Sequence, residues 1–263
     1  MPTQQEIVDS QELIIETFKG FRAELMQAYG DINHLAKHDG SPVTELDIKI
    51  EMTLKDKLLA RFPDFGFRGE ETKAVASRNN AVWYIDPIDG TSSFIHGLPY
   101  CSNMAGLVVD GEIVASVIYH FATDELYTAF KGKGSYKNGK RIFVKNTTLD
   151  NSYVFADGYS YRNIYDFYAP NHVKFYAPMG ATGYFLTRVA QGSIQGACYL
   201  GAKINHHDVI PGALLVLEAG GEAVSFTGKP FDYTSLRFMM GTKNICDLTV
   251  NHLSDITSKA KLD

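Results

Sequence analysis

Two aspartates stand three residues apart just after an apolar stretch of the chain. They are Asp86 and Asp89 in the segment DPIDGTS (residues 86–92), which follows the apolar run AVWYI. A turn at Pro87 and a helix beginning near residue 90 would let both carboxylates face one point. The backbone amides at that helix N-terminus would bind an anion such as phosphate; they belong to Gly90, Thr91 and Ser92. Because carboxylates repel an anion unless a divalent cation lies between them, the segment indicates magnesium-assisted phosphoryl chemistry.

Each of these aspartates also has a purely structural interpretation. Asp-Pro and Asp-Gly are turn-forming pairs, and either carboxylate could cap a helix. A single aspartate at this place would favour that interpretation. The pair, together with Glu70 and Glu71 shortly upstream, favours a metal site, although adjacent glutamates on a loop are by themselves more often solvated than catalytic.

Four blocks of the sequence resemble the inositol monophosphatase family of magnesium-dependent, lithium-sensitive phosphatases. They are VTELD at 43–47, GEET at 69–72, WYIDPIDGTSSFIHGLP at 83–99 and HDVIPGALLVLEAGG at 207–221. The segment GKPFDYTS at 228–235 is similar to the region that follows the family's last motif. The resemblance extends over essentially the whole chain, and the block around Asp86 is its most specific part.

The resemblance implies a site for two to three magnesium ions. Glu70 and Asp86 would bind the first ion together with the carbonyl oxygen of Ile88. Asp86, Asp89 and Asp208 would bind the second, and Glu70, which is also expected to assist catalysis, would reach a third, weaker ion through water. Hard oxygen ligands suit magnesium, and paired ions neutralise a phosphate while orienting the attacking water.

A hydroxyl and a further carboxylate are expected beside the attacking water. Thr91 would position the water with its hydroxyl hydrogen-bonded to Asp47, as the resemblance implies. Thr91 could instead be an ordinary first-turn helix residue, and Asp47 matches a capping pattern with Thr44, so Asp47 could serve both purposes. Lys37 would either screen the acidic cluster or be a solvated loop lysine, and Glu71 is expected to have a structural role.

Asp208 lies where the chain departs from the family pattern. The family usually has tryptophan directly before this aspartate, whereas His207 stands here, and VIP at 209–211 replaces alanine-rich positions. Asp208 still precedes an apolar helix, which it could cap. His206 and His207 suggest zinc, but neighbouring side chains in an extended stretch point in opposite directions, and no further His or Cys stands at metal-ligand spacing. We therefore expect no zinc site.

The substrate is expected to meet residues on the far side of the site. In inositol-selective members a glutamate several residues before the last aspartate contacts sugar hydroxyls, and an ungapped count places Gly201 there. Asp89 and Asp208 would also contact the substrate, and the opposite wall would contain Gly180, Ala181 and Thr182. The tyrosine-rich segment 153–176 could line a pocket for an aromatic, imidazole or nucleotide group, or belong to the core or to a dimer interface.

Two helices are predicted to precede the first strands. One follows the capping-box pattern TQQE at residues 3–6 and would end near Gly30. The second would run from Thr44 to about Pro63. Its buried face would carry Ile48, Met52 and Leu59.

From residue 81 onward the pattern changes to strands. The pairs Asp110-Gly111 and Asn138-Gly139 indicate two hairpins, so antiparallel strands should dominate the middle of the chain. Helices at 180–193 and 206–221 then alternate with strands at 194–200 and 222–226. We expect a mixed α/β protein with an N-terminal α+β subdomain at 1–150, carrying most metal ligands, and a C-terminal subdomain at 151–263. The resemblance implies the layered αβαβα sugar-phosphatase fold of inositol monophosphatase and fructose-1,6-bisphosphatase.

Length and composition exclude other classes of protein. The 263 residues include 25 Lys and Arg against 30 Asp and Glu, which gives a net charge of −5. This charge disfavours nucleic acid as a partner bound through bulk electrostatic attraction. No apolar run approaches a membrane span, and the first residues lack both a basic leader and an apolar signal core, so we expect neither a membrane partner nor export. Cys101, Cys198 and Cys246 are scattered, which is typical of reduced thiols in a cytoplasmic protein.

These features together predict a phosphatase that hydrolyses a small phosphate monoester by direct attack of metal-activated water. Inositol monophosphate (myo-inositol 1-phosphate) is the first candidate substrate. The alternatives are histidinol phosphate, fructose 1,6-bisphosphate, adenosine 3′,5′-bisphosphate and NADP. A weakly active regulator that binds proteins is an alternative of another class, although every expected metal ligand is present. The resemblance also implies inhibition by lithium and a homodimer.

Overall fold

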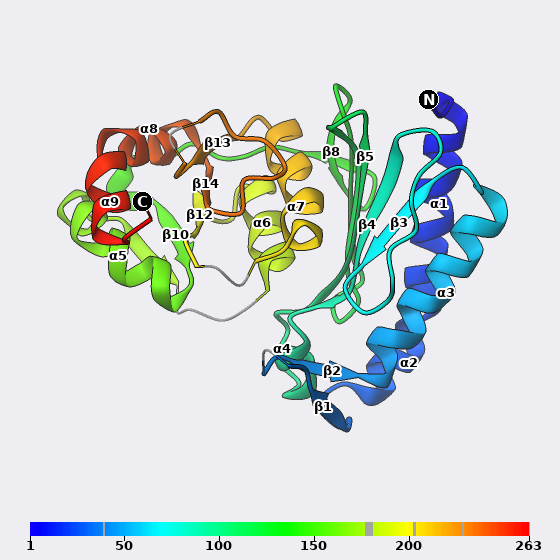
Figure 1. The fold of residues 1–263 in the computed structure, drawn as a ribbon. Coiled ribbons are helices and arrows are strands. Elements are labelled where there is room, and N and C mark those ends of the chain that lie inside the picture. The colour runs from blue at the N-terminus through cyan, green and yellow to red at the C-terminus, as the bar shows by residue number, and fades with distance from the viewer. Residues whose placement is uncertain (39, 177–180, 202–203, 228, 263) are drawn as a thin grey trace.

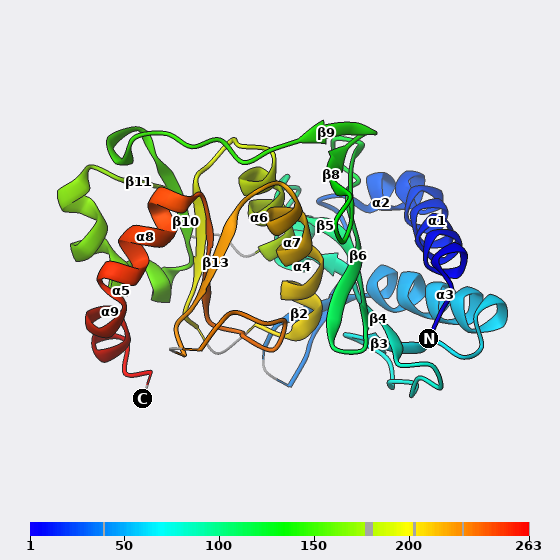
Figure 2. The same ribbon diagram turned by 90° about the horizontal axis from the view of Figure 1, so that it is seen from above.

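The computed structural model describes residues 1–38, 40–176, 181–201, 204–227 and 229–262. Its elements form five layers, which Figures 1 and 2 show from two directions. Helices α1 (Gln4–Gly20) and α3 (Glu45–Arg61) cover the outer face of a seven-stranded sheet. Helices α6 (Thr182–Ala190) and α7 (His206–Glu218) lie between this sheet and a five-stranded one. The outer face of the smaller sheet is covered by α5 (Gly158–Tyr168), α8 (Lys243–Asn251) and α9 (Leu253–Lys259). The predicted αβαβα layering is thus confirmed.

The larger sheet has the strand order β3-β4-β5-β6-β7-β8-β9. Strand β3 pairs in parallel with β4, and the remaining neighbours are antiparallel, as the hairpin signals predicted. The strands are β3 (Gly66–Gly69), β4 (Ala81–Asp89), β5 (Ser102–Val109), β6 (Glu112–His120), β7 (Glu125–Phe130), β8 (Gly134–Lys137) and β9 (Lys140–Ile142). Both predicted hairpin turns are present, with positive φ at Asp110, Gly111, Asn138 and Gly139.

The smaller sheet is mixed and has the order β11-β10-β12-β14-β13. Its strands are β10 (Tyr153–Ala156), β11 (Lys174–Tyr176), β12 (Gly196–Tyr199), β13 (Glu222–Ser225) and β14 (Phe238–Gly241). The shorter elements are α2 (Arg22–Ala28), α4 (Thr91–Ile95), β1 (His34–Ala36), β2 (Pro42–Thr44) and the 3₁₀ turns η1 (Leu149–Asn151) and η2 (Ala169–Asn171). Within the described residues, no helix combines the length and the apolar character that crossing a membrane requires.

The N-terminal helices differ from the prediction in two respects. The capping box between Thr3 and Glu6 starts α1 as expected, but the helix breaks at Phe21 and α2 follows. The predicted buried face of α3 is wrong, because Ile48 and Met52 are 43% and 52% exposed. The helix instead packs on β4 and α1 through an unbroken series at four-residue spacing, Leu46, Ile50, Leu54 and Leu58. Each such side chain stabilises the fold by about 2 kcal/mol when buried, so the longer series decides which face turns inward.

Helix α7 is bound to the larger sheet along its length. Ser116 and Ser135 donate hydrogen bonds of 2.6 Å to the carbonyl oxygens of Pro211 and Leu215. At its C-terminal end, the Glu218 carboxylate accepts hydrogen bonds from the backbone amides of Gly132 and Gly134, at 2.7 and 2.8 Å. A side chain at Gly106 of β5 would place its Cβ 2.5 Å from Ile210, so glycine there permits the close approach. These contacts fix where the N-terminus of α7 points.

Candidate active site

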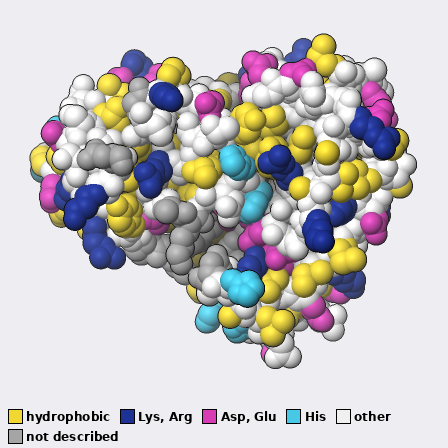
Figure 3. All heavy atoms as spheres, in the orientation of Figure 1, with side chains coloured by type: hydrophobic (Ala, Val, Ile, Leu, Met, Phe, Trp, Pro, Cys, Tyr) yellow, Lys and Arg dark blue, Asp and Glu magenta, His cyan; other side chains and the backbone are white. Residues whose placement is uncertain are grey.

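Four carboxylates from three separate segments meet at one cavity. Asp86 and Asp89 end β4, Glu70 follows the neighbouring strand β3, and Asp208 lies in the first turn of α7. All four line a cavity of about 320 Å³. Figure 3 shows this face of the molecule hollowed between its two halves, with acidic and histidine side chains along the hollow. The topology thus brings together the residues that the sequence predicts as metal ligands.

An irregularity at the end of β4 aims both aspartates into the cavity. Asp86 is paired with Met104 and Asp89 with Ser102, so the register shifts between them. The chain then turns at Gly90, whose φ of 78° is left-handed and where a Cβ would lie 2.3 Å from the carbonyl oxygen of Tyr100. Glycine is therefore required at this turn. The predicted phosphate-binding residues Gly90, Thr91 and Ser92 all line the cavity.

Asp89 is bound by the N-terminus of α6. The amides of Thr182 and Gly183 donate to its two carboxylate oxygens at 3.0 and 2.9 Å, and Ser102 donates at 3.3 Å. Burial and the nearby Asp208 raise the pKa of Asp89 to about 7 in spite of these hydrogen bonds. The charge of Asp89 is therefore only partly compensated by the protein.

The negative charges of Asp86 and Asp208 are compensated by fewer hydrogen bonds than that of Asp89. Asp86 is 2% exposed, and within the part of the chain that the structure describes its Oδ1 has no hydrogen-bond partner. Burial, Glu70 and Asp89 raise the pKa of Asp86 well above its usual range. Burial also raises the pKa of Asp208 to about 7, although the backbone amide of Asn205 donates to it at 2.7 Å. Several buried carboxylates with raised pKa values and one orphaned oxygen form a site that a cation would stabilise.

The donor atoms fall into two sets that are each compact enough for one ion. Asp86, Asp89 and Asp208 each offer an oxygen within 4.8 Å of the others. Glu70, Asp86 and His207 form a second such set. Carboxylate oxygens are the ligands that hard divalent cations prefer, so the residues fit the metal that the sequence predicts.

Thr91 and Asp47 lie together as expected. The Thr91 hydroxyl is 3.3 Å from Oδ1 of Asp47 and 2.9 Å from the carbonyl oxygen of Ile88. The other oxygen of Asp47 accepts hydrogen bonds from the amide and hydroxyl of Thr44, at 2.8 and 2.5 Å, and so caps α3. Burial raises the pKa of Asp47 to about 6 against the effect of those bonds. Asp47 therefore both caps a helix and faces Thr91.

Lys37 is an ion-pair partner of the cluster rather than a solvated loop residue. Its ammonium lies 2.5 Å from Glu70 and 2.5 Å from Glu71. Burial by itself lowers the pKa of Lys37, but these two carboxylates raise it above its usual value. The pKa of Glu71 is raised to about 7, chiefly by burial. The pairing places one fixed positive charge beside the acidic cluster.

Glu51 supports the Glu70 loop and was not predicted from the sequence. It is fully buried on α3, and its carboxylate accepts hydrogen bonds from the amides of Glu71 and Thr72 at 2.9 and 2.7 Å. A Cβ at Gly69 would lie 2.0 Å from Oε1 of Glu51, so this approach requires glycine. The sequence signal was an acidic residue next to Ile50, on the apolar side of the helix.

The two histidines lie in the first turn of α7, not in an extended stretch, so the geometric reason for dismissing them was wrong. His206 contacts the rings of Tyr84 and Tyr233. His207 lines the cavity, with Nε2 3.8 Å from Glu70 and 3.9 Å from Asp208. One of the two imidazoles therefore belongs to the acidic cluster.

The predicted substrate wall is partly as expected. Ala181, Thr182 and Gly201 line the cavity, whereas Gly180 lies outside the described residues. Asp157 and Tyr199 also line it, and the Tyr199 hydroxyl is buried without a hydrogen-bond partner among the described residues. The ideal Cβ position at Gly201 is 3.6 Å from Oδ2 of Asp157, so a carboxylate faces the predicted substrate-contacting position.

The tyrosines of segment 153–176 do not form this wall. Among the described residues, the part of that segment lining the cavity consists of Phe155 and Asp157. Tyr168 is buried and hydrogen-bonded to Thr249, whereas Tyr159 and Tyr165 are 45% and 43% exposed. Tyr176 lines a separate hollow of about 180 Å³ together with Tyr100 and Tyr184. The tyrosines of this segment are thus placed outside the acidic cavity, and a role in binding a ligand elsewhere stays a prediction.

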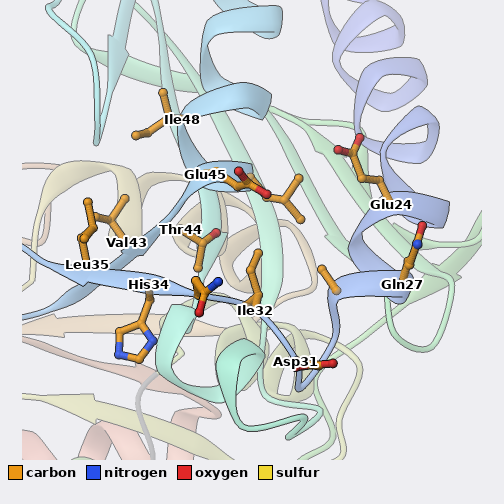
Figure 4. A pocket seen from close by; sticks show the side chains of 13 residues that line it. Glu24, Gln27, Asp31, Ile32, His34, Leu35, Val43, Thr44, Glu45 and Ile48 are labelled. Carbon is orange, nitrogen blue, oxygen red and sulfur yellow. The ribbon is translucent and has the colours of Figure 1, made fainter.

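A larger hollow lies elsewhere, between α2, the β1–β2 hairpin and α3 (Figure 4). Its volume is about 710 Å³, but its side chains come from separate elements and do not converge on one point. One of its carboxylates, Glu24, is paired with Lys49 at 2.6 Å. Size alone therefore does not make this hollow the reactive site.

Comparisons with known proteins agree with this geometry. The family model described as "Inositol monophosphatase family" matches residues 8–258. The chain is 31% identical to inositol monophosphatase 2 of Solanum lycopersicum over 236 residues, covering 81% of this chain and 85% of that protein. It is 44% identical to the histidinol-phosphatase of Chlorobaculum parvum over 109 residues, covering 41% and 42% of the two chains.

A solved structure shows the same fold. The IMPase of Thermotoga maritima superposes with a TM-score of 0.86 at 26% identity, covering 96% of this chain and 99% of that one. The family is metal-dependent, and the acidic cluster is of a kind that could hold a metal ion. The chain therefore belongs to the inositol monophosphatase family and is a phosphatase, a phosphoric monoester hydrolase.

Proposed function

We propose that the protein is a magnesium-dependent phosphatase that releases inorganic phosphate from a small phosphate monoester. The observation that carries this proposal is the largely buried carboxylate cluster, in which Oδ1 of Asp86 has no partner among the residues that the structure describes. Glu70, Asp86 and the Ile88 carbonyl would hold one Mg²⁺, and Asp86, Asp89 and Asp208 a second, with a weaker third ion near Glu70. Bound Mg²⁺ supplies charge neutralisation and Lewis acidity toward the phosphoryl oxygens.

The chain's own groups orient the reactants. Gly90, Thr91 and Ser92 line the cavity, and their backbone amides would bind the phosphate oxygens. The Thr91 hydroxyl, facing Asp47, would hold the attacking water, and Asp47 would take up its proton. Water attacks phosphorus as the bond from phosphorus to the alcohol oxygen breaks, and the leaving oxygen takes up a proton from a solvent water. Asp47 returns its proton to solvent, so that one water is consumed and alcohol and phosphate are released. No side-chain nucleophile is required.

Inositol monophosphate is the first candidate substrate. The family match and the similarity to an inositol monophosphatase over most of the chain support it. The cavity of about 320 Å³ suits a ligand of that size. Asp157, facing the position of Gly201, offers a carboxylate that could accept hydrogen bonds from sugar hydroxyls.

Histidinol phosphate is the second candidate. The 44% identity to a histidinol-phosphatase over 109 residues favours it. Asp157, which lines the cavity, could pair with the ammonium group of that substrate. The same carboxylate therefore serves either substrate, and only a direct comparison separates them.

A panel of phosphomonoesters tests the proposal. Phosphate release is measured with Mg²⁺ for inositol 1-phosphate, histidinol phosphate, fructose 1,6-bisphosphate, adenosine 3′,5′-bisphosphate and NADP. We expect Mg²⁺-dependent release that is abolished by a chelator and inhibited by Li⁺, with the highest kcat/KM for one of the first two. A protein without activity on the whole panel would exclude the enzyme proposal and leave the regulator.

We also propose a cytoplasmic homodimer. The three cysteines are buried and unpaired, which suits a reducing compartment. Sedimentation equilibrium would measure the dimer directly, and a monomer at micromolar concentration would contradict it.

A further inference from the structure

His207 occupies a position from which its imidazole can reach a metal ion. The side chain is 12% exposed and lines the cavity. Its Nε2 lies 3.8 Å from Oε2 of Glu70, and donor atoms of Glu70, Asp86 and His207 lie within 4.8 Å of one another. Two ligands of one ion, each about 2.1 Å from it, can be up to about 4.2 Å apart, so the separation from Glu70 fits shared coordination.

A second observation points to a ligand at this set. Oδ1 of Asp86 is buried and has no hydrogen-bond partner among the described residues, on a side chain that is 2% exposed. An uncompensated carboxylate oxygen in such a place is costly unless a cation binds it. A carboxylate oxygen of Asp86 lies within 4.8 Å of the His207 imidazole, so the two side chains border the same space.

The local fold explains why only one of the two histidines is available. Both lie in the first turn of α7, which Ser116 and Ser135 fix against the larger sheet. Successive side chains of a helix point about 100° apart. His207 consequently faces Glu70, while the ring of His206 lies against Tyr84 and Tyr233, 6.2 and 6.3 Å between ring centroids.

The donor chemistry of the two sets differs. Asp86, Asp89 and Asp208 provide oxygen atoms only, a set suited to Mg²⁺. An imidazole nitrogen binds Mn²⁺, Co²⁺ and Zn²⁺ more tightly than it binds Mg²⁺, which prefers oxygen ligands. We propose that His207 Nε2 is a metal ligand of the Glu70–Asp86 site, so that this site holds transition-metal ions more tightly than the all-oxygen site does. The inference rests on the metal-dependent phosphatase proposed above and concerns the identity of one of its ions.

Pulsed electron paramagnetic resonance of bound Mn²⁺ tests this directly. Nitrogen attached to the ion modulates the spin echo, whatever the activity of the enzyme. Mn²⁺ is added at less than one equivalent, with Mg²⁺ in excess to occupy the oxygen-only set. We expect ¹⁴N modulation in the wild type and in the control His206→Ala, and none in His207→Phe. Calorimetry should show Mn²⁺ affinity reduced at least about tenfold in His207→Phe, with Mg²⁺ affinity changed little.

The possible outcomes separate the two proposals. Mn²⁺ that binds to the wild type without ¹⁴N modulation overturns the ligand role of His207 and leaves the phosphatase proposal intact. ¹⁴N modulation that persists in His207→Phe also overturns the ligand role of His207 and leaves the phosphatase proposal intact. A wild-type protein that binds no Mn²⁺ and no Mg²⁺ overturns both. If His207→Phe does not fold, wild-type protein with ¹⁵N-labelled histidine decides the question, because a coordinated imidazole replaces the ¹⁴N pattern by that of ¹⁵N.

Discussion

Oγ1 of Thr91 lies 3.3 Å from Oδ1 of Asp47, whose other oxygen caps α3. One carboxylate thus joins the helix that starts after Thr44 to the hydroxyl at the start of α4. We expect Thr91→Val, which removes the hydroxyl at nearly constant volume, to lower kcat by about 100-fold or more with KM little changed. Thr91→Ser, which keeps the hydroxyl, is the matched control and should stay within a small factor of the wild type. Steady-state phosphate release measures both, and equal loss in the two variants would point to packing instead of water positioning.

Asp89→Asn should nearly abolish turnover while the fold persists. The amide removes a charge from the all-oxygen set, and it can accept only one of the bonds now donated by Thr182 and Gly183. Loss of a metal-ligand charge is expected to lower kcat by about 100-fold or more. Circular dichroism should be unchanged. Asp56→Asn, on the exposed side of α3, makes the same chemical change away from the site and should leave turnover unchanged. Wild-type turnover in Asp89→Asn would show that Asp89 is not part of the metal site.

Binding of Mg²⁺ should become tighter as the pH rises from 6 to 8. The pKa values of Asp89 and Asp208 are raised to about 7 in the metal-free fold. These carboxyl groups therefore stay protonated in the fold up to about pH 7, whereas in the unfolded chain they lose their protons at about pH 4. Folding of the metal-free protein therefore loses stability from these groups as pH rises between those values. Bound Mg²⁺ neutralises the repulsion between these carboxylates, but it must first displace the protons that they carry. The gain in Tm on adding Mg²⁺, measured at several pH values, should thus grow toward pH 8, and a constant gain would contradict the charge assignment.

A separate buried network should make the protein sensitive to acid. The Arg188 guanidinium can only donate hydrogen bonds, and its Nη2 lies 3.0 Å from Nδ1 of His120. Nδ1 must therefore be the acceptor, and the ring hydrogen is on Nε2, which faces the Thr187 hydroxyl. Burial and Arg188 lower the pKa of His120 to about 3. The unfolded chain therefore binds a proton below about pH 6.5 that the fold excludes, and stability is lost as pH falls toward 3.

This loss can be assigned to His120 by substitution. One proton corresponds to about 1.4 kcal/mol per pH unit in the free energy of unfolding. His120→Asn should be less stable than the wild type at pH 7.5, since it loses hydrogen bonds, but its free energy of unfolding should fall less steeply between pH 6.5 and 4. Urea unfolding at each pH measures both slopes. Identical slopes would mean that His120 is protonated in the fold.

Part of the acidic cluster could be predicted because the relevant spacing is local. Asp86, Asp89 and the turn at Gly90 lie within one short segment, and the resemblance supplied Glu70 and Asp208 from distant ones. The side of α3 that is buried was not predicted correctly, although Leu46, Ile50, Leu54 and Leu58 repeat at a single spacing. Apolar residues occupy more than one face of that helix, and only the position of β4 decides between them.

Other parts of the site depend on contacts that no local pattern contains. Glu51 reaches the Glu70 loop because Gly69 leaves room for its carboxylate. His207 enters the cluster because α7 begins at His206. No elements were predicted after residue 226, where the structure has β14, α8 and α9.

The attachment of α7 at Ser116, Ser135 and Glu218 has a consequence for how substrate is admitted. The helix that carries Asp208 cannot tilt away from the larger sheet, whose strand β4 carries Asp86, without breaking the buried hydrogen bonds from Ser116 and Ser135. Separating Asp208 from Asp86 is therefore not an easy way to open the reactive centre. Substrate must enter a preformed socket, and repulsion among the carboxylates is retained in the metal-free fold until a cation arrives, because the helix cannot move to relieve it.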